Sequence, residues 1–193
     1  MSTVQPVSFD SEPLILVDQE DRAIGYMPKS QCHRGHGTLH RAFSVFLFNA
    51  RGELLLQQRS ESKPLWPLYW SNSCCSHPRR GESIEQASLR RVLEELGVEC
   101  HLTWLYKFIY QADYLEVGAE HEFCHVLIGR CTGDVVVHPD EIAAWRWLSM
   151  EQLNQDLNER PDRFTPWFKL EWARLQQDWM AEIQALQHRR KSA

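Results

Sequence analysis

The chain has 193 residues, 43% of them hydrophobic, and a formal net charge of −5. This length supports one domain with a substantial core, and the acidic balance argues against nucleic-acid binding dominated by phosphate contacts. No apolar stretch is long enough to span a membrane and residues 1–11 lack the apolar block of a signal peptide, so we expect a cytoplasmic protein with reduced cysteines and no membrane partner.

The first third of the chain predicts strands joined by turns and loops. Two short apolar segments flank an Asp-rich turn at 18–21 and predict a hairpin. The glycine- and histidine-containing segment after it predicts a loop, as does a later segment with two prolines. The expected strands are 14–17, 22–27, 40–49 and 53–59, and the expected loops are 29–39 and 60–69.

Residues 70–98 form the central segment, a cysteine-containing loop followed by a helix. Ser83 and Gln86 form a capping box, and Gly97 suits the left-handed residue that ends a helix. The helical spacing predicts one apolar stripe facing the core, with an Arg–Glu pair one turn apart beside that stripe. The stripe would consist of Leu89, Val92, Leu93 and Leu96, and the pair of Arg91 and Glu95.

The last part of the chain predicts three more strands and two helices. Ser149 and Gln152 form a second capping box for a helix to about residue 158. Thr165 and Pro166 open a final helix, whose helical period continues to 186 and whose end at 188–191 is basic. The strands are expected at 102–111, 120–131 and 145–148. We expect an α/β (α+β) fold, a mixed sheet sandwiched between helices, with an N-terminal hairpin and a docked C-terminal helix. We expect one domain over 1–193, with 1–11 flexible and the core at about 14–186.

Three histidines and two glutamates are candidate metal ligands. His33 and His40 lie on either side of the glycine-broken loop, and His77 lies in the cysteine-containing loop. Glu120 and Glu122 are two residues apart on an expected strand, so both side chains face the same way. Such a set suits a divalent ion, with Zn, Mn or Mg as candidates. Because a lone histidine is more often a surface or capping residue, the hypothesis requires the five to meet in space.

Four basic residues are candidates for binding an anionic ligand such as a diphosphate. They are Lys29, Arg59, Lys63 and Arg91, and arginine offers a fork geometry for phosphate oxygens. Most lysines and arginines are solvated, so a simple surface role stays open for each of them.

Eight tryptophans are a heavy aromatic load for this length. We expect most of them in the core, including Trp66, Trp70, Trp145 and Trp147. An aromatic face in a pocket also stabilises a positive charge, by about 2 kcal/mol or more when desolvated. Trp167 and Tyr110 are candidates for that role.

Five motifs resemble those of the type I isopentenyl-diphosphate Δ-isomerases, members of the Nudix-fold superfamily, over Leu14 to Trp172. They are HRGHGTLHRAF, SNSCCSHP, GESIEQASLRRVLEELG, EHEF and FTPWF. A Nudix box is recognisable from Ser76 to Val98, with Ser76 in place of its first glycine. Arg91 stands where the box of the pyrophosphohydrolases has a metal-binding glutamate, which argues for holding a diphosphate rather than cleaving it.

The resemblance implies a Nudix-type fold and a complete set of site residues. Cys75 and Glu122 match the catalytic pair, and Tyr110 and Trp167 match residues beside the reacting carbons. The implied ligands of an Mn²⁺, Mg²⁺ or Zn²⁺ site are His33, His40, His77, Glu120 and Glu122, with Cys75 adjoining them. Glu95 matches a residue of a second Mg²⁺ site that bridges to the substrate diphosphate, and the substrate-binding residues are Lys29, Arg59, Lys63 and Arg91.

The implied reaction is the isomerisation of isopentenyl diphosphate to dimethylallyl diphosphate through a tertiary carbocation. Cys75 and Glu122 would act from opposite faces of the flat substrate. Two alternatives stay open: a Nudix pyrophosphohydrolase acting on a nucleotide or a prenyl diphosphate, and a non-enzymatic metal-binding module. The residues leave open whether the protein is a monomer or a homodimer.

Overall fold

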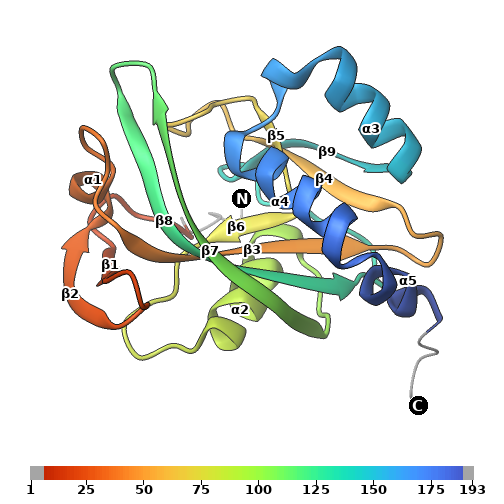
Figure 1. Ribbon diagram of the computed structural model, residues 1–193, viewed down its shortest axis with the longest axis horizontal. Helices are drawn as coiled ribbons and strands as arrows, with labels where there is room; N and C mark the ends of the chain where they lie inside the picture. Colours follow the sequence, from red (N-terminus) through yellow and green to blue (C-terminus); the bar gives the residue numbers. More distant parts are fainter. Residues whose placement is uncertain (1–6, 189–193) are drawn as a thin grey trace, which may run out of the picture.

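One mixed sheet of nine strands forms the centre of the computed structural model, which describes residues 7–188 (Figure 1). Most strands are rich in β-branched, aromatic or leucine side chains, which favour a pleated and half-buried surface. The strands are β1 Pro13–Val17, β2 Ala23–Pro28, β3 His40–Phe48, β4 Leu54–Arg59, β5 Trp70–Ser71, β6 Cys74–Ser76, β7 Leu102–Tyr114, β8 Gly118–Arg130 and β9 Ile142–Leu148.

Strand β3 is the buried centre of the sheet. It pairs in parallel with β8 over its whole length, beginning with His40 opposite Glu122. It also pairs antiparallel with β6, where Ser44 lies opposite Cys75. The strands β6 and β8 therefore lie on either side of β3, roughly 9.5 Å apart at the usual strand spacing.

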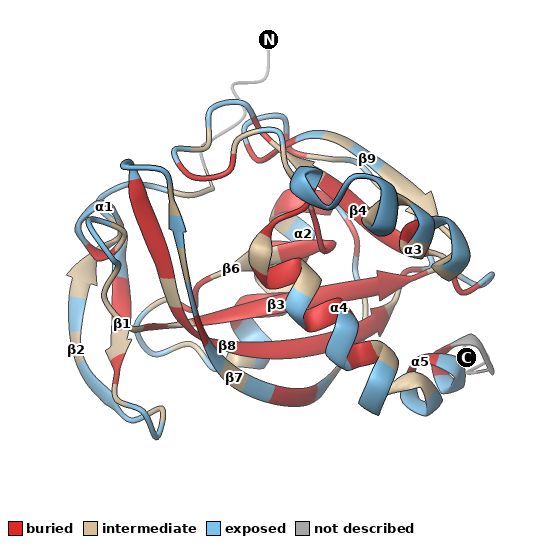
Figure 2. Cartoon of the chain, turned by 45° about the horizontal axis from the view of Figure 1, so that its top comes forward, coloured by how far each residue is buried: buried red, intermediate tan, exposed pale blue. Residues whose placement is uncertain are grey.

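Helices cover both faces of the sheet (Figure 1). Helix α2 packs against one face, where Val92 and Leu96 join the buried side chains of Phe43 and Val45. Helix α4 packs against the other, where Phe168 joins a second core. Figure 2 shows the central strands of the sheet as largely buried and the outer sides of α3 and α4 as exposed. The helices are α1 Lys29–Cys32, α2 Ile84–Leu96, α3 Met150–Glu159, α4 Pro166–Asp178 and α5 Met180–His188, with a 3₁₀ turn at Pro161–Arg163.

The predicted fold class, the N-terminal hairpin and both capping boxes are confirmed. The side chains of Ser83 and Ser149 each accept a hydrogen bond from the third helical N–H. The side-chain oxygen of the glutamine at that third position accepts one from the backbone N–H of the serine. Gly97 adopts a φ of 66°, the left-handed conformation expected at the end of α2.

The predicted apolar stripe of α2 is right for Val92 and Leu96 and wrong for Leu93. Leu93 is 50% exposed, whereas Arg91 and Glu95 are buried with Val92 and Leu96. The helix is rotated so that its ion pair faces the sheet, because other buried charges lie opposite that face. The sequence pattern alone does not report those partners.

Other expectations also need correction. The predicted loop at 29–39 begins with the single turn of α1, and the cysteine-containing loop holds the short strands β5 and β6. The predicted final helix breaks at Trp179, whose φ of −130° is not helical. Trp145 is 37% exposed rather than in the core.

The single-domain assignment stays a prediction. The expected flexibility of 1–11 and the basic end at 188–191 fall partly outside the described residues. Among the helices that the structure describes, none is long and apolar enough to cross a membrane.

Candidate active site

A pocket with a cavity volume of about 50 Å³ brings together most of the predicted site residues. Its walls come from α1, from the loop after β4, and from strands β6, β7 and β8, with α4 closing it. Of the predicted site residues, His40 and Glu95 do not line it; both lie fully or almost fully buried behind its wall. The polar and aromatic lining residues are Lys29, His33, Arg59, Lys63, Cys75, His77, Arg91, Tyr110, Glu120, Glu122, Glu141 and Trp167.

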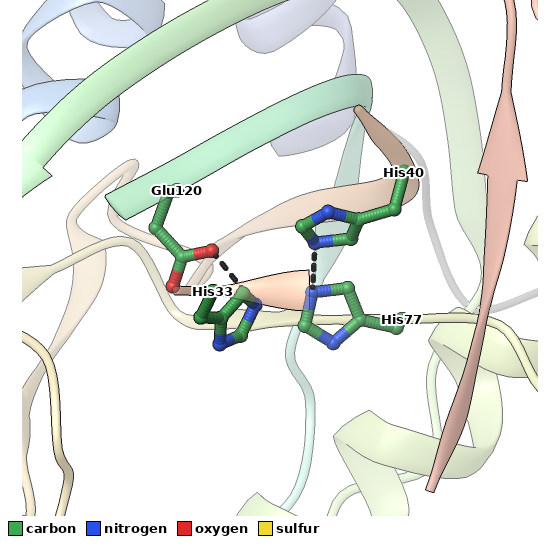
Figure 3. A group of neighbouring side chains, drawn as sticks. All are labelled: His33, His40, His77 and Glu120. Carbon is green, nitrogen blue, oxygen red and sulfur yellow. Dashed lines mark hydrogen bonds and ion pairs between the residues drawn. The ribbon is translucent and has the colours of Figure 1, made fainter. Parts of the chain in front are cut away.

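Three histidines and Glu120 converge at the floor of the pocket (Figure 3). One potential ligand atom from each of the four lies within 4.8 Å of the others. His33 Nε2 is 3.1 Å from a Glu120 oxygen, and the Nε2 atoms of His40 and His77 are also 3.1 Å apart. The rings come from α1's carboxyl end, from β3 and from the segment after β6, so only the folded sheet brings them together.

Glu122 is the fifth member of this group. Its Oε1 lies 3.1 Å from His77 Nε2 and 3.7 Å from His40 Nε2. Its Oε2 accepts a hydrogen bond of 2.6 Å from the Tyr110 hydroxyl, because Tyr110 lies directly opposite Glu122 on the β7–β8 ladder. As predicted, Glu120 and Glu122 both face the pocket.

The floor of the pocket strongly perturbs the proton affinities of its residues. Burial lowers the pKa of His33 to about 2 and that of His77 to about 4, so both imidazoles are neutral near pH 7. Burial opposes protonation of His40, but its hydrogen bonds to neighbouring groups prevail and raise its pKa to about 10. Burial and the adjacent Glu122 raise the pKa of Glu120 to about 8, whereas hydrogen bonds from His40 and His77 overcome burial and hold the pKa of Glu122 below its usual range.

These residues fit a divalent metal ion. His33 Nε2 and Glu120 Oε2 lie 3.1 Å apart but not in hydrogen-bond geometry, so neither buried atom has a hydrogen-bond partner, an arrangement that is costly unless a cation shares the site. His40 Nδ1 lies 2.7 Å from the Thr38 carbonyl oxygen. A backbone carbonyl in that position accepts from Nδ1 and fixes the ring, so that a bound ion would take the place of the proton that Nε2 otherwise carries. Imidazole nitrogens and carboxylate oxygens together suit several divalent ions.

We expect the purified protein to contain about one equivalent of a divalent metal, and His33→Ala to lower the metal affinity by about 100-fold or more. Loss of even an outer-shell partner of a metal ligand typically costs about 10–100-fold. His36→Ala is the matched control, because His36 lies in the same loop but its side chain is 85% exposed and pairs with Asp113. Elemental analysis and competition with a chelator measure both. Equal affinity in the His33 and His36 variants would contradict the site.

Cys75 reaches the same pocket from the opposite side of β3. Its side chain is partly buried, and burial raises the pKa of its thiol to about 12, although the Arg59 guanidinium opposes this shift. Arg59 Nη1 lies 3.9 Å from the sulfur. The thiol is therefore protonated near pH 7. Cys74 packs with the side chains on the α2 face and is separated from the pocket.

Trp167 and Tyr110 form an aromatic wall. Their ring centroids are 6.1 Å apart, and Trp66 packs edge-on against Trp167 at 5.1 Å. The Arg59 guanidinium lies 5.3 Å from the centre of the Trp167 ring, which shows that this face accommodates a positive charge. The Trp167 Nε1 atom is buried without a hydrogen-bond partner.

Glu141 is a pocket residue that the sequence analysis missed. Its carboxylate forms ion pairs with Lys63 and, at 3.2 Å, with Arg91. Arg91 also bonds Glu95 at 2.6 Å, as the helical spacing predicts. Glu141 lies just before β9 with no local pattern to mark it. The only hint is that four predicted basic residues in one pocket require compensating charge.

The four basic residues meet in the pocket, and each already has protein partners. Arg59 Nη2 donates a hydrogen bond of 2.9 Å to the Leu65 carbonyl oxygen. Lys29 Nζ bonds the Ser8 hydroxyl at 2.7 Å, and Arg91 bonds the Val7 carbonyl at 2.6 Å in addition to its carboxylates. Lys63 is paired with Glu141. Residues 7 and 8 thus approach the same side of the pocket.

We expect Arg91→Met to destabilise the protein by about 3–5 kcal/mol, because removing one partner leaves the buried Glu95 and Glu141 carboxylates uncompensated. Both Arg91 and Glu95 are at most 3% exposed. Arg22→Met is the control, since its pair with Asp18 is largely solvated and such pairs contribute about 0–1 kcal/mol. Urea denaturation measures both. Similar unfolding free energies for the two variants would contradict the structural role of the buried pair.

Comparisons with known proteins identify one family model and several similar isomerases. The NUDIX domain family matches residues 38–168. A Photorhabdus laumondii isopentenyl-diphosphate Delta-isomerase is 41% identical over 86% of this chain and 96% of its own. The Nocardia farcinica isopentenyl-diphosphate Delta-isomerase is 47% identical over 80% of this chain and 89% of its own.

Solved structures of lower identity share the fold. A Deinococcus radiodurans protein superimposes with a TM-score of 0.63 at 26% identity, covering 77% of this chain and 90% of its own. A MutT protein from Methanosarcina mazei superimposes with a TM-score of 0.60 at 19% identity, covering 72% of this chain and 94% of its own.

Proposed function

The chain belongs to the NUDIX domain family and, within it, to the isopentenyl-diphosphate Δ-isomerases, and we propose that its pocket isomerises isopentenyl diphosphate to dimethylallyl diphosphate. The observation that supports this most strongly is the placement of Cys75 and Glu122. They lie on strands on either side of β3 and line the same pocket. A double-bond shift needs one proton added and another removed, and two proton-transferring groups in one pocket suit it.

The reaction adds a proton to the terminal carbon of the alkene and removes one from the carbon two positions along the chain. Between the two steps the charge lies on a tertiary carbon. One of Cys75 and Glu122 gives the first proton and the other accepts the second. Because the reaction is reversible, the two exchange roles in the reverse direction. No group leaves the substrate, so its diphosphate is unchanged.

Tyr110 and Trp167 support these transfers. The Tyr110 hydroxyl bonds Glu122 and fixes the direction of its carboxyl group. The Trp167 ring lies in the pocket wall, where its face stabilises the transient cation and its bulk excludes water that would capture it. An aromatic face supplies charge stabilisation without a nucleophile that could attack the cation.

A divalent ion completes this site. Mn²⁺, Mg²⁺ or Zn²⁺ would be held by His33, His40, His77, Glu120 and Glu122, and when bound it lowers the proton affinity of Glu122 and fixes its position. Binding of a second Mg²⁺ by Glu95 with the substrate diphosphate stays a prediction. It requires the Glu95 carboxylate to exchange its bond with Arg91.

The basic side of the pocket would hold the diphosphate. Arg59 ends strand β4, Lys63 lies in the loop after it, and Lys29 and Arg91 approach from α1 and α2. A diphosphate carries enough negative charge to compete with Glu141 and with the N-terminal segment for these groups. The hydrocarbon end then points towards Cys75, Glu122 and Trp167.

A pyrophosphohydrolase of the same fold is the alternative. Arg91 argues against it, because a buried cation occupies the position of a metal-binding glutamate in the Nudix box. Incubation of the protein with isopentenyl diphosphate and Mg²⁺, followed by NMR of the products and a phosphate assay, separates the two functions. We expect dimethylallyl diphosphate without phosphate release, and release of phosphate or pyrophosphate would contradict the proposal.

The cytoplasmic location and the choice between monomer and homodimer stay predictions.

A further inference from the structure

A buried carboxyl group lies in the layer behind the proposed catalytic residues. Glu171 follows Trp167 by one turn of α4 and is completely buried. Its Oε1 lies 3.4 Å from Cys124 Sγ, while Oε2 has no hydrogen-bond partner. An apolar side chain would fill this space without the cost of burying a polar group. A carboxyl group here therefore requires an explanation beyond packing.

Glu171 links α4 to three strands. Its carboxyl group accepts a hydrogen bond from Cys124 Sγ on β8, and the same sulfur lies 3.5 Å from the Ser44 hydroxyl on β3, which connects the helix to both strands. Its backbone carbonyl accepts a hydrogen bond of 3.4 Å from the Tyr106 hydroxyl on β7. Most of the remaining contacts of α4 with the sheet are apolar, so these bonds give the helix a defined register against the strands.

Glu171 and two of its strand neighbours lie close to proposed catalytic residues. Glu171 is one helical turn from Trp167 on α4. Ser44 lies opposite Cys75 on the β3–β6 ladder, and Cys124 follows Glu122 by two residues on β8.

Burial raises the pKa of Glu171 to about 8; the hydrogen bonds to Ser44 and Cys124 oppose this shift, and the nearby Glu122 adds to it. The carboxyl group is therefore mostly neutral near pH 7. In that form it donates one hydrogen bond and accepts others without placing a fixed charge behind Cys75 and Glu122. A glutamine side chain offers both kinds of bond as well.

We infer that Glu171 is a positioning residue that holds the Trp167 ring in register with Cys75 and Glu122 by tying α4 to β3 and β8. The inference rests on the proposed function. Proton transfer to an alkene is sensitive to placement, and a shift of about 1 Å in a supporting residue is able to cost about 100-fold in rate. Substrate binding depends on the basic groups of α1, α2 and the loop after β4, none of which Glu171 contacts.

Glu171→Met tests this role, with Glu171→Gln as the conservative variant. We expect Glu171→Met to lower kcat by about 10–100-fold and to leave KM for isopentenyl diphosphate within about two-fold. Glu171→Gln should recover kcat to within about three-fold of the wild type. The melting temperature of the methionine variant should not fall, because an apolar group replaces a partly unsatisfied polar one.

Leu175→Ala is the matched control, one turn further along α4 and also completely buried. It removes apolar packing and should lower the melting temperature while keeping kcat. The inference is overturned if Glu171→Met keeps its kcat, if Glu171→Gln loses as much as Glu171→Met, or if Leu175→Ala loses kcat equally. A wild-type protein without isomerase activity would instead overturn the proposed function.

Discussion

Cys75→Ala is expected to lower kcat by about 10³–10⁴-fold while KM for isopentenyl diphosphate stays within a few-fold. A positioned acid or base contributes about 10²–10⁴-fold, and an alkene without activating groups depends strongly on it. Alanine cannot transfer a proton, and the methyl group leaves the basic side of the pocket untouched. Steady-state kinetics with NMR detection of dimethylallyl diphosphate measures the effect.

Cys74→Ala is the control for this variant. Cys74 precedes Cys75 on β6, but its side chain packs on the other face of the sheet with the core under α2. We expect it to lower the melting temperature through lost packing and to keep kcat. If Cys75→Ala were as active as Cys74→Ala, the thiol of Cys75 would have no part in the reaction.

Glu122→Gln is the second change with a large expected effect, a fall in kcat of about 10³–10⁴-fold. The amide still accepts the hydrogen bond from Tyr110, but it neither takes up a proton nor supplies the negative charge that faces His40 and His77. We therefore also expect weaker metal binding, measured by elemental analysis beside the kinetics.

His121→Gln separates these effects from a general disturbance of β8. The His121 side chain alternates to the other face of the strand and lies against Gly37 rather than in the pocket. It should keep both kcat and metal content. A Glu122→Gln enzyme with near wild-type turnover would rule out proton transfer by this carboxyl group.

The fold was predictable where local chemistry determines the structure. The capping boxes at Ser83 and Ser149 and the left-handed Gly97 follow from side chains within four residues of each helix end. The orientation of α2 was not predictable, because the burial of Arg91 depends on its ion pair with Glu141, which lies fifty residues away in the sequence. The sequence also gives no sign of the helix break at Trp179, because the helical spacing of apolar residues continues across it.

The candidate site divides in the same way. The motifs were sufficient to predict the histidines and glutamates as site residues. The register of β3 with β8 explains how His40 and Glu122 come together. Glu141 and Glu171 belong to no motif. Their burial depends on partners in other elements, Lys63 and Arg91 for one and Ser44 and Cys124 for the other.

Isomerisation in heavy water tests the central claim most directly. Transfer of a solvent-derived deuteron from an enzyme group to the terminal carbon should place deuterium in a methyl group of dimethylallyl diphosphate. The Cys75→Ala and Glu122→Gln enzymes should form little labelled product. Product without deuterium, or deuterated product at wild-type rates from either variant, would contradict the account in which Cys75 and Glu122 exchange protons with the substrate.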